Sequence, residues 1–187
     1  MERIKIRYRT TTRLRMSVGV NGDLNVSAPR GTPREVIQSF IDKNSEWIAR
    51  AREKAGQRRS ARDEFFSRLP LSTNHEARET TRRMNELILP LVKKHAAEMG
   101  VNPKVIRYRA TRSRLGSCCK ATGQVMFSVY LLLFPEWIAE HVVVHELAHL
   151  IEPNHGPGFY RLMDRHFPRW SEAREATRKI LTGSADN

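Results

Sequence analysis

Apolar and basic side chains alternate along the first residues of the chain. Ile4, Ile6 and Tyr8 occupy every second position, and the residues between them are Lys or Arg. A period of two places the apolar side chains on one face of a β-strand and the basic ones on the other. Two further alternating runs, 14–20 and 24–28, flank an Asn-Gly pair that is typical of a hairpin turn. The pattern predicts a three-stranded antiparallel meander.

The hydrophobic spacing becomes helical after Thr32. This threonine suits the N-cap position, Pro33 the first helical position and Glu35 the capping box. Apolar residues at helical spacing continue to Ile48 and predict a helix that packs on the sheet. After Arg50 the pattern fades into a polar, arginine-rich run. We interpret this run as an exposed helix tail or linker, and it marks the best domain boundary in the chain.

The second half of the chain begins with a further helix and two strands. Residues 76–99 show a helical apolar stripe, in which Pro90 should bend the helix and Gly100 should follow its end. Alternating runs at 105–109 and 124–129 predict two strands with a Lys-Ala-Thr-Gly turn between them.

A helix expected after Pro135 carries the most distinctive motif of the sequence. His145 and His149 are four positions apart, so both imidazoles lie on one helical face and can bind one metal ion. Glu146 is next to His145 and can reach a water on that metal. Zinc lowers the pKa of its water to near 7, and a carboxylate can take the proton as the water attacks a carbonyl. The motif therefore predicts a catalytic zinc site with Glu146 as the general base.

A third histidine follows the end of this helix. Pro153 disfavours helical geometry at Glu152, so the helix should end close to that residue. The glycine-rich turn beyond it can fold His155 back toward the pair. Three histidines leave a fourth position for water, which is typical of catalytic and not of structural zinc. We predict one Zn2+ ion per chain, bound by His145, His149 and His155.

Composition and charge narrow the class of protein. The 187 residues are enough for one domain, or for one domain with an appendage, and 40% hydrophobic and 28% charged residues are ordinary for a globular protein. The two cysteines, 118 and 119, are neighbours, which excludes a secreted-type disulfide framework. No window is typical of a membrane span or signal peptide, so we expect a cytoplasmic protein. A formal net charge of +13 favours a polyanionic partner, nucleic acid first, with a merely solvated basic surface as the alternative.

These motifs together resemble one known family, the YgjP-like metallopeptidases. The resemblance rests on Val142-Val143-Val144-His145-Glu146-Leu147-Ala148-His149, Asn154-His155, Phe159-Tyr160 and the upstream block Arg114-Leu115-Gly116-Ser117-Cys118. It implies a zincin-type zinc peptidase, related to the SprT-like and Wss-type proteases that act on DNA-bound proteins. It also implies that the metal and catalytic roles fall on the three histidines and Glu146. The chain departs from the family pattern at Leu115, where Trp is usual, and at Ser128, where Asn is common.

We therefore expect an α+β fold with four regions. An N-terminal antiparallel β-meander plus helix (1–50) is joined by a basic connector (51–75) to a zincin-like metallopeptidase core (76–182). That core holds a short sheet and the His-Glu-x-x-His zinc helix, and a disordered tail (183–187) follows it.

Further residues are candidates for roles around the metal. Tyr160, Arg114 and His166 carry donors that could stabilise the oxyanion of a tetrahedral intermediate. His141, one turn before His145, is expected to face solvent. Candidate nucleic-acid contacts come from a segment that has six basic residues and no acid between Met99 and Pro135: Arg107, Arg109, Arg112 and Arg114. For Tyr160, Arg114 and His166, packing or surface solvation is the favoured role, and for the basic segment the alternative is a solvated surface.

The sequence thus predicts a zinc-dependent peptidase that hydrolyses peptide bonds in protein substrates and acts near DNA or RNA. A substrate strand could add to an exposed sheet edge, where main-chain hydrogen bonds give affinity with little sequence selectivity. Two alternatives stay open. One is a basic nucleic-acid-binding protein with a structural or vestigial zinc site, and the other is a non-peptidase zinc hydrolase that leaves polypeptides uncut.

Overall fold

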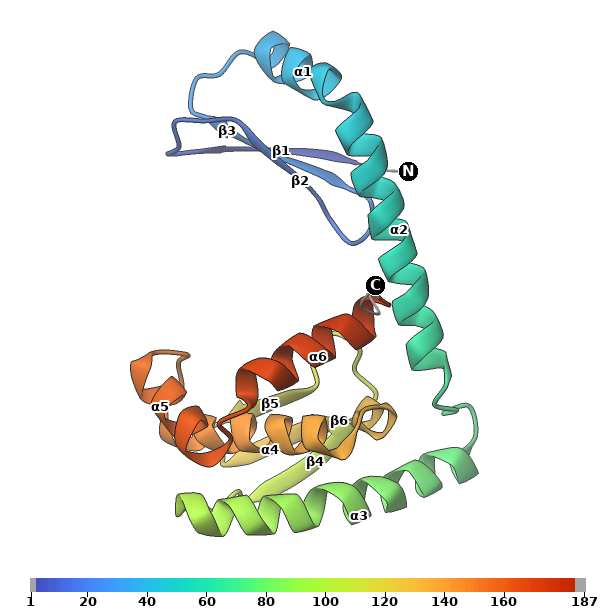
Figure 1. Ribbon diagram of the computed structural model, residues 1–187, viewed down its shortest axis with the longest axis vertical. Coiled ribbons are helices and arrows are strands. Elements are labelled where there is room, and N and C mark those ends of the chain that lie inside the picture. The colour runs from blue at the N-terminus through green and yellow to red at the C-terminus, as the bar shows by residue number, and fades with distance from the viewer. Residues whose placement is uncertain (1–2, 184–187) are drawn as a thin grey trace. The chain divides into compact units, whose positions relative to one another are not determined.

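The computed structural model describes residues 3–183, which form six α-helices, one 3-10 helix and two three-stranded mixed sheets (Figure 1). The expected α+β class is confirmed. The chain divides into two compact units, residues 3–63 with Leu181–Gly183 and residues Glu64–Ile180. Apart from Gly183, the expected disordered tail lies outside the described residues. Among the helices of residues 3–183, none has the length and hydropathy that a membrane span requires.

The sheet of the first unit has a different topology from the one expected. Its strands β1 (Ile4–Arg9), β2 (Arg15–Val18) and β3 (Leu24–Pro29) lie in the order β1-β3-β2. β2 and β3 form the expected antiparallel hairpin, but β1 pairs with β3 in parallel, with Ile4 opposite Leu24. The prediction of an antiparallel meander was wrong because alternation decides which face a strand buries, and not which strand lies beside it or in which direction.

Two helices replace the single helix expected after this sheet. α1 (Arg34–Lys43) and α2 (Ser45–Ser67) meet at Asn44, and α2 continues through much of the arginine-rich run. The expected capping box is absent, since Pro33 is the N-cap and the Thr32 hydroxyl donates to the carbonyl of Pro29 at the end of β3. Apolar side chains of both helices pack against β2 and β3 and form the core of this unit.

The second unit begins with the helix that the sequence predicted. α3 (Asn74–Met99) starts with a capping box between Thr73 and Glu76 and contains Pro90. Gly100 follows the helix with φ of 66°, a left-handed conformation that glycine adopts without steric cost.

The sheet of the second unit carries one strand that the hydrophobic pattern did not show. β4 (Val105–Arg109), β5 (Gly116–Cys119) and β6 (Gln124–Ser128) lie in the order β4-β6-β5. β4 runs parallel to β6, and β5 runs antiparallel to it, so the Lys-Ala-Thr-Gly turn joins β5 to β6. The Gly-Ser-Cys-Cys sequence of β5 has little intrinsic strand preference, which explains why periodicity missed it.

Helix α4 (Glu136–Ile151) is the element that carries the histidine motif. A 3-10 helix, η1 (Val129–Leu133), joins β6 to α4. Eight residues of α4 are buried. It ends at an extended Glu152, directly before Pro153, as predicted. α5 (Pro157–His166) and α6 (Trp170–Thr182) follow, and Phe159 and Met163 of α5 pack against α4.

His95 of α3 connects α3 to α4 inside this unit. It is 3% exposed, and its Nε2 lies 2.7 Å from Oε1 of Glu140 on α4. The same carboxylate oxygen accepts a hydrogen bond from Lys94 Nζ at 2.9 Å. A buried imidazole hydrogen-bonded to a carboxylate thus fixes how α4 lies on α3.

Substitution of His95 by alanine is expected to lower the free energy of unfolding by about 2 kcal/mol, because it removes a buried hydrogen bond and leaves a cavity. His95→Gln keeps a donor near Glu140 and should lose less. Denaturant unfolding of both variants measures the difference. Equal stability of wild type and His95→Ala would show that this contact does not hold α4 in place.

Candidate metal centre

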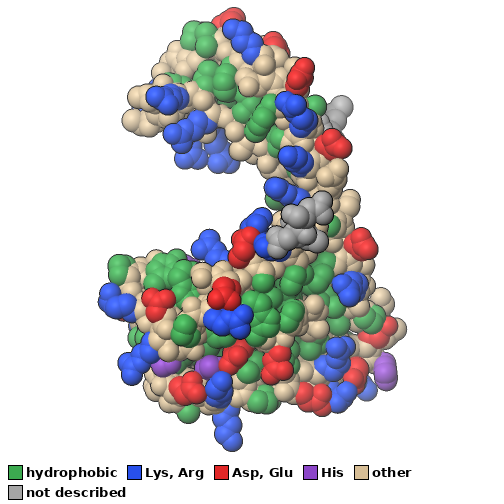
Figure 2. Space-filling view, viewed as in Figure 1, with side chains coloured by type: hydrophobic (Ala, Val, Ile, Leu, Met, Phe, Trp, Pro, Cys, Tyr) green, Lys and Arg blue, Asp and Glu red, His purple; other side chains and the backbone are tan. Residues whose placement is uncertain are grey.

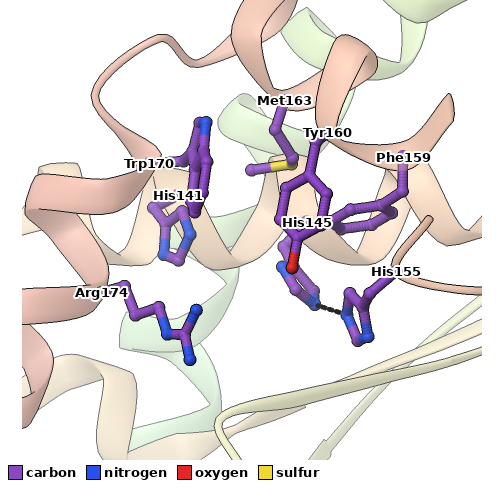
Figure 3. Close-up of a pocket in the computed structure, with 8 residues that line it drawn as sticks. All are labelled: His141, His145, His155, Phe159, Tyr160, Met163, Trp170 and Arg174. Carbon is purple, nitrogen blue, oxygen red and sulfur yellow. Dashed lines mark hydrogen bonds between the residues drawn. The ribbon is translucent and has the colours of Figure 1, made fainter. Parts of the chain in front are cut away.

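Three histidines converge on one point at the end of α4. His145 and His149 come from consecutive turns of the helix, and His155 comes from the turn that leads into α5. Their ligand nitrogens lie within 4.8 Å of one another, and the Nε2 atoms of His145 and His155 are 3.0 Å apart (Figure 3). Tetrahedral zinc with Zn–N bonds of 2.0–2.1 Å requires nitrogens about 3.3 Å apart. The cluster therefore fits a zinc ion.

The end of the helix orients one of these imidazoles. Because Pro153 forces Glu152 out of the helix, the Glu152 carbonyl is free to accept a hydrogen bond from His149 Nδ1, at 3.1 Å. A backbone carbonyl on one imidazole nitrogen fixes the ring and leaves Nε2 available to a metal.

An aromatic ring supports all three imidazoles. Phe159, 1% exposed, stacks on His149 with ring centroids 4.7 Å apart and an interplanar angle of 28°. Its ring meets those of His145 and His155 edge-on, with centroids 4.9 and 4.7 Å away. The three imidazoles therefore rest on a buried aromatic ring.

Burial keeps two of the imidazoles in the form that binds metal. It lowers the pKa of His145 to about 3, with help from the neighbouring histidines. Burial also lowers the pKa of His149, against the opposing effect of the hydrogen bond that this imidazole donates to the Glu152 carbonyl. A neutral imidazole offers the lone pair that zinc requires.

Glu146 lies beside the cluster, on the side of the helix that faces β5. It is 5% exposed, and its Oε2 atom has no hydrogen-bond partner among the described residues. Burial raises its pKa to about 8, while the charge of Arg114 opposes the shift. A Cβ at Gly116 of β5 would lie 2.5 Å from Glu146 Oε1, so the carboxylate occupies the space that a side chain there would take.

Two hollows open on the histidines. One, of about 320 Å³, is lined by Glu146, all three histidines and residues of β5 including Cys118. The other, of about 370 Å³, shares His145 and His155 and extends between α4, α5 and α6 (Figure 3). Burial raises the pKa of the Cys118 thiol to about 11, with Glu146 adding to the shift. This cysteine therefore lines the first hollow as a neutral thiol.

The remaining candidates for oxyanion stabilisation lie in different places. Tyr160 lines the larger hollow beside His145 and His155. Arg114 is exposed on the loop before β5, close enough to Glu146 to affect its pKa. His166 ends α5 and lines neither of the two hollows described above.

His141 does not face solvent as expected. It is half-buried in the larger hollow, with its ring centroid 5.7 Å from that of Phe167. Burial lowers its pKa to about 4, with a smaller effect of Arg174, and its buried Nδ1 has no partner in the described part of the chain. The expectation was wrong because α5 and α6 cover this face of α4, which helical spacing alone does not show.

The four candidate nucleic-acid arginines differ in their surroundings. Arg107 and Arg109 lie on the exposed face of β4, where Arg107 donates to Gln124. Arg112 lies over the rings of Phe66 and Tyr130, at 5.6 and 5.7 Å from their centroids. These ring contacts give Arg112 a packing role that the sequence did not suggest. On the face of the second unit visible in Figure 2, basic side chains are scattered among acidic and apolar ones.

The sequence also did not assign the roles of several residues around the site. Phe159 contributes to the resemblance to the family, but nothing in its spacing shows that it supports three imidazoles. Gly116 offered a usable signal, since a glycine inside a strand often marks a close approach. The two departures from the family pattern meet in space, because the Ser128 amide donates to the Leu115 carbonyl and the Ser128 hydroxyl to that of Thr111.

The sequence of the second unit matches a metallopeptidase domain. Residues 71–179, more than half of the chain, match the metallopeptidase domain of the YgjP-like family. The chain therefore belongs to the YgjP-like metallopeptidases. The matched residues lie in the second unit.

Two solved structures are similar to parts of this chain. The metallopeptidase zymogen of Pyrococcus abyssi abylysin is 23% identical over 51% of this chain and 93% of its own, with a TM-score of 0.45. The zymogen of Methanocaldococcus jannaschii jannalysin is 20% identical over 50% and 96%, with a TM-score of 0.46. No curated protein matches the chain.

Proposed function

We propose that this protein is a zinc-dependent peptidase that hydrolyses peptide bonds in protein substrates, with Glu146 as the general base. The observation that carries the proposal is the convergence of three imidazoles beside a buried carboxylate, at the meeting point of two hollows. Membership of a metallopeptidase family supports the reaction class.

In this proposal His145, His149 and His155 would hold the ion. A bound zinc supplies a Lewis acid, which lowers the pKa of water and polarises a carbonyl. The donor set has no thiolate and only three members, which is the pattern of catalytic and not of structural zinc.

Glu146 would move the proton in the proposed reaction. Its carboxylate removes a proton from the attacking water and later returns it to the leaving amine. A cation nearby favours the ionised form of a buried carboxylate, so the base would be in its active form when the site is loaded. The unpartnered Oε2 leaves this side chain with a free acceptor for the water.

β5 offers a position for the substrate backbone. It is an edge strand, its outer side is not paired within the sheet, and it lines the hollow that contains Glu146. An extended peptide that adds to this edge would bring its carbonyls past the histidines. The Tyr160 hydroxyl would then be the nearest of the three candidate donors for the oxyanion, since it lines a hollow with His145 and His155.

Zinc binding should depend on all three histidines. We expect one zinc per chain in the wild type, and an affinity reduced by more than about 100-fold in His149→Ala, because removal of a ligand exceeds the 10–100-fold effect of outer-shell partners. Zinc content after equilibrium dialysis measures this. His141→Gln is the matched control and should keep full zinc, since His141 is outside the cluster. A wild type without bound zinc would contradict the site.

The contact with nucleic acid stays a proposal that rests on the net charge of +13. Digestion of a basic DNA-binding protein by the zinc-loaded enzyme, with and without single-stranded DNA, tests reaction and recruitment together. Cuts that disappear on chelation and return with zinc are the expected result, and stimulation by DNA that weakens with salt would connect the charge to the function. Cleavage at the same rate with and without DNA would support the peptidase activity and contradict the proposed nucleic-acid partner.

The same experiments separate the two alternatives. A nucleic-acid-binding protein with a structural or vestigial zinc would bind DNA equally well when Glu146 is replaced. A non-peptidase zinc hydrolase would bind zinc and leave every polypeptide intact. The buried carboxylate beside the histidines argues against the first, because a structural zinc has no use for it.

A further inference from the structure

The larger hollow beside the histidines has a composition that the reaction itself does not explain. It shares His145 and His155 with the candidate metal centre, so any group inside it lies next to the bond that would be cut. At about 370 Å³ it has room for a substrate side chain. It is therefore a position for part of the substrate.

Most of this hollow is apolar. Phe159, Met163 and Trp170 contribute to its walls, and Trp170 packs on Tyr160 with ring centroids 5.1 Å apart. The Trp170 ring is held by its Nε1, which donates to Asp164 at 2.8 Å. Walls of this kind bury the methylene groups or the ring of a side chain.

One cation faces this apolar space. Arg174 of α6 lines the hollow, and its guanidinium points into it (Figure 3). Arg174 forms no ion pair with any acid among residues 3–183. The two acids nearest to it on α6 are bonded to other arginines: Glu172 to Arg169, and Glu175 to Arg178. Its donors are available to a ligand.

From this arrangement we infer that the hollow binds a carboxylate of the substrate, held by Arg174 next to the metal centre. The inference rests on the proposed peptidase function and names its substrate class. A guanidinium pairs with a carboxylate through two parallel, charge-assisted hydrogen bonds. The carboxylate has two sources in a polypeptide, the side chain of Asp or Glu and the free C-terminus.

Matched peptides separate these two sources. The first pair has amidated C-termini and differs by one internal Glu or Gln. The second pair contains no acidic side chain and ends in a free acid or an amide. For one of the pairs, the wild type should cleave the carboxylate form at least about tenfold faster in kcat/KM, the usual effect of a hydrogen bond to a charged group.

Arg174→Gln tests the assignment of the cation. This variant should cleave the two peptides of the preferred pair with nearly equal kcat/KM. The control is Arg178→Gln, the same change on the same helix outside the hollow, which should preserve the preference for the carboxylate form. Arg174→Glu should reverse it in favour of a peptide with Lys in place of the internal Glu. A ratio near one for both pairs in the wild type overturns the inference, as does a preference that Arg174→Gln leaves intact.

A binding measurement separates failure of this inference from failure of the proposed function. Zinc-loaded Glu146→Gln is titrated calorimetrically with the same four peptides, and the carboxylate form should bind more tightly only when Arg174 is present. Such binding without any cleavage by the wild type would reject the peptidase and keep the carboxylate pocket. Cleavage without a carboxylate preference in either measurement would reject the pocket and keep the peptidase.

Discussion

Glu146→Gln is expected to lower the rate of peptide hydrolysis by about 10²–10⁴-fold, the usual contribution of a general base, while zinc content stays at the wild-type level. Glutamine has nearly the shape of glutamate but cannot accept the proton of the attacking water. Steady-state kinetics and zinc analysis on the same sample measure both quantities.

The fold should survive this substitution. Glu146 is 5% exposed, and burial already raises its pKa to about 8, so a neutral side chain in its place relieves the cost of a buried charge. Unfolding free energy equal to or above that of the wild type is the expected control. Full activity of Glu146→Gln would assign the base to another residue and overturn the central role of this carboxylate.

Gly116→Ala is expected to lower activity by about 100-fold, because a shift of about 1 Å in a catalytic group has effects of that size. The added Cβ would lie 2.5 Å from Oε1 and 2.6 Å from Cγ of Glu146, so the whole buried side chain must move. The three heavy atoms nearest to this Cβ all belong to Glu146, so the histidines should keep their places and zinc content should stay unchanged.

The cost of this substitution in stability should be only about 1–3 kcal/mol, as for other overpacked sites. Gly56→Ala in α2 is the matched control, since a Cβ there meets nothing within 4 Å and should leave activity unchanged. If Gly116→Ala retains wild-type kcat/KM, the carboxylate is not held against β5 as described.

Much of the second unit could be predicted because its signals are local. The C-terminal ends of α3 and α4 follow from Gly100 and from Pro153, each of which acts on its immediate neighbours. The spacing of His145 and His149 within a helix gave two of the three converging imidazoles, and the turn after Pro153 gave the third.

The features that sequence reasoning missed depend on residues far apart in the chain. The parallel pairing of β1 with β3 leaves no trace in the alternation of either strand. The close approach of Gly116 to Glu146 joins positions thirty residues apart, and the hollow around Arg174 joins three helices. Neither helical spacing nor residue type shows which side chains meet across such separations.

The central claim is that the three histidines and Glu146 form a site at which water cleaves a peptide bond. Its most direct test is to digest a peptide library with the zinc-loaded protein in water enriched in heavy oxygen and to analyse the products by mass spectrometry. The account predicts new C-termini that carry one heavy oxygen, present in the wild type and absent in Glu146→Gln. A fully zinc-loaded wild type that produces no new C-termini would contradict it.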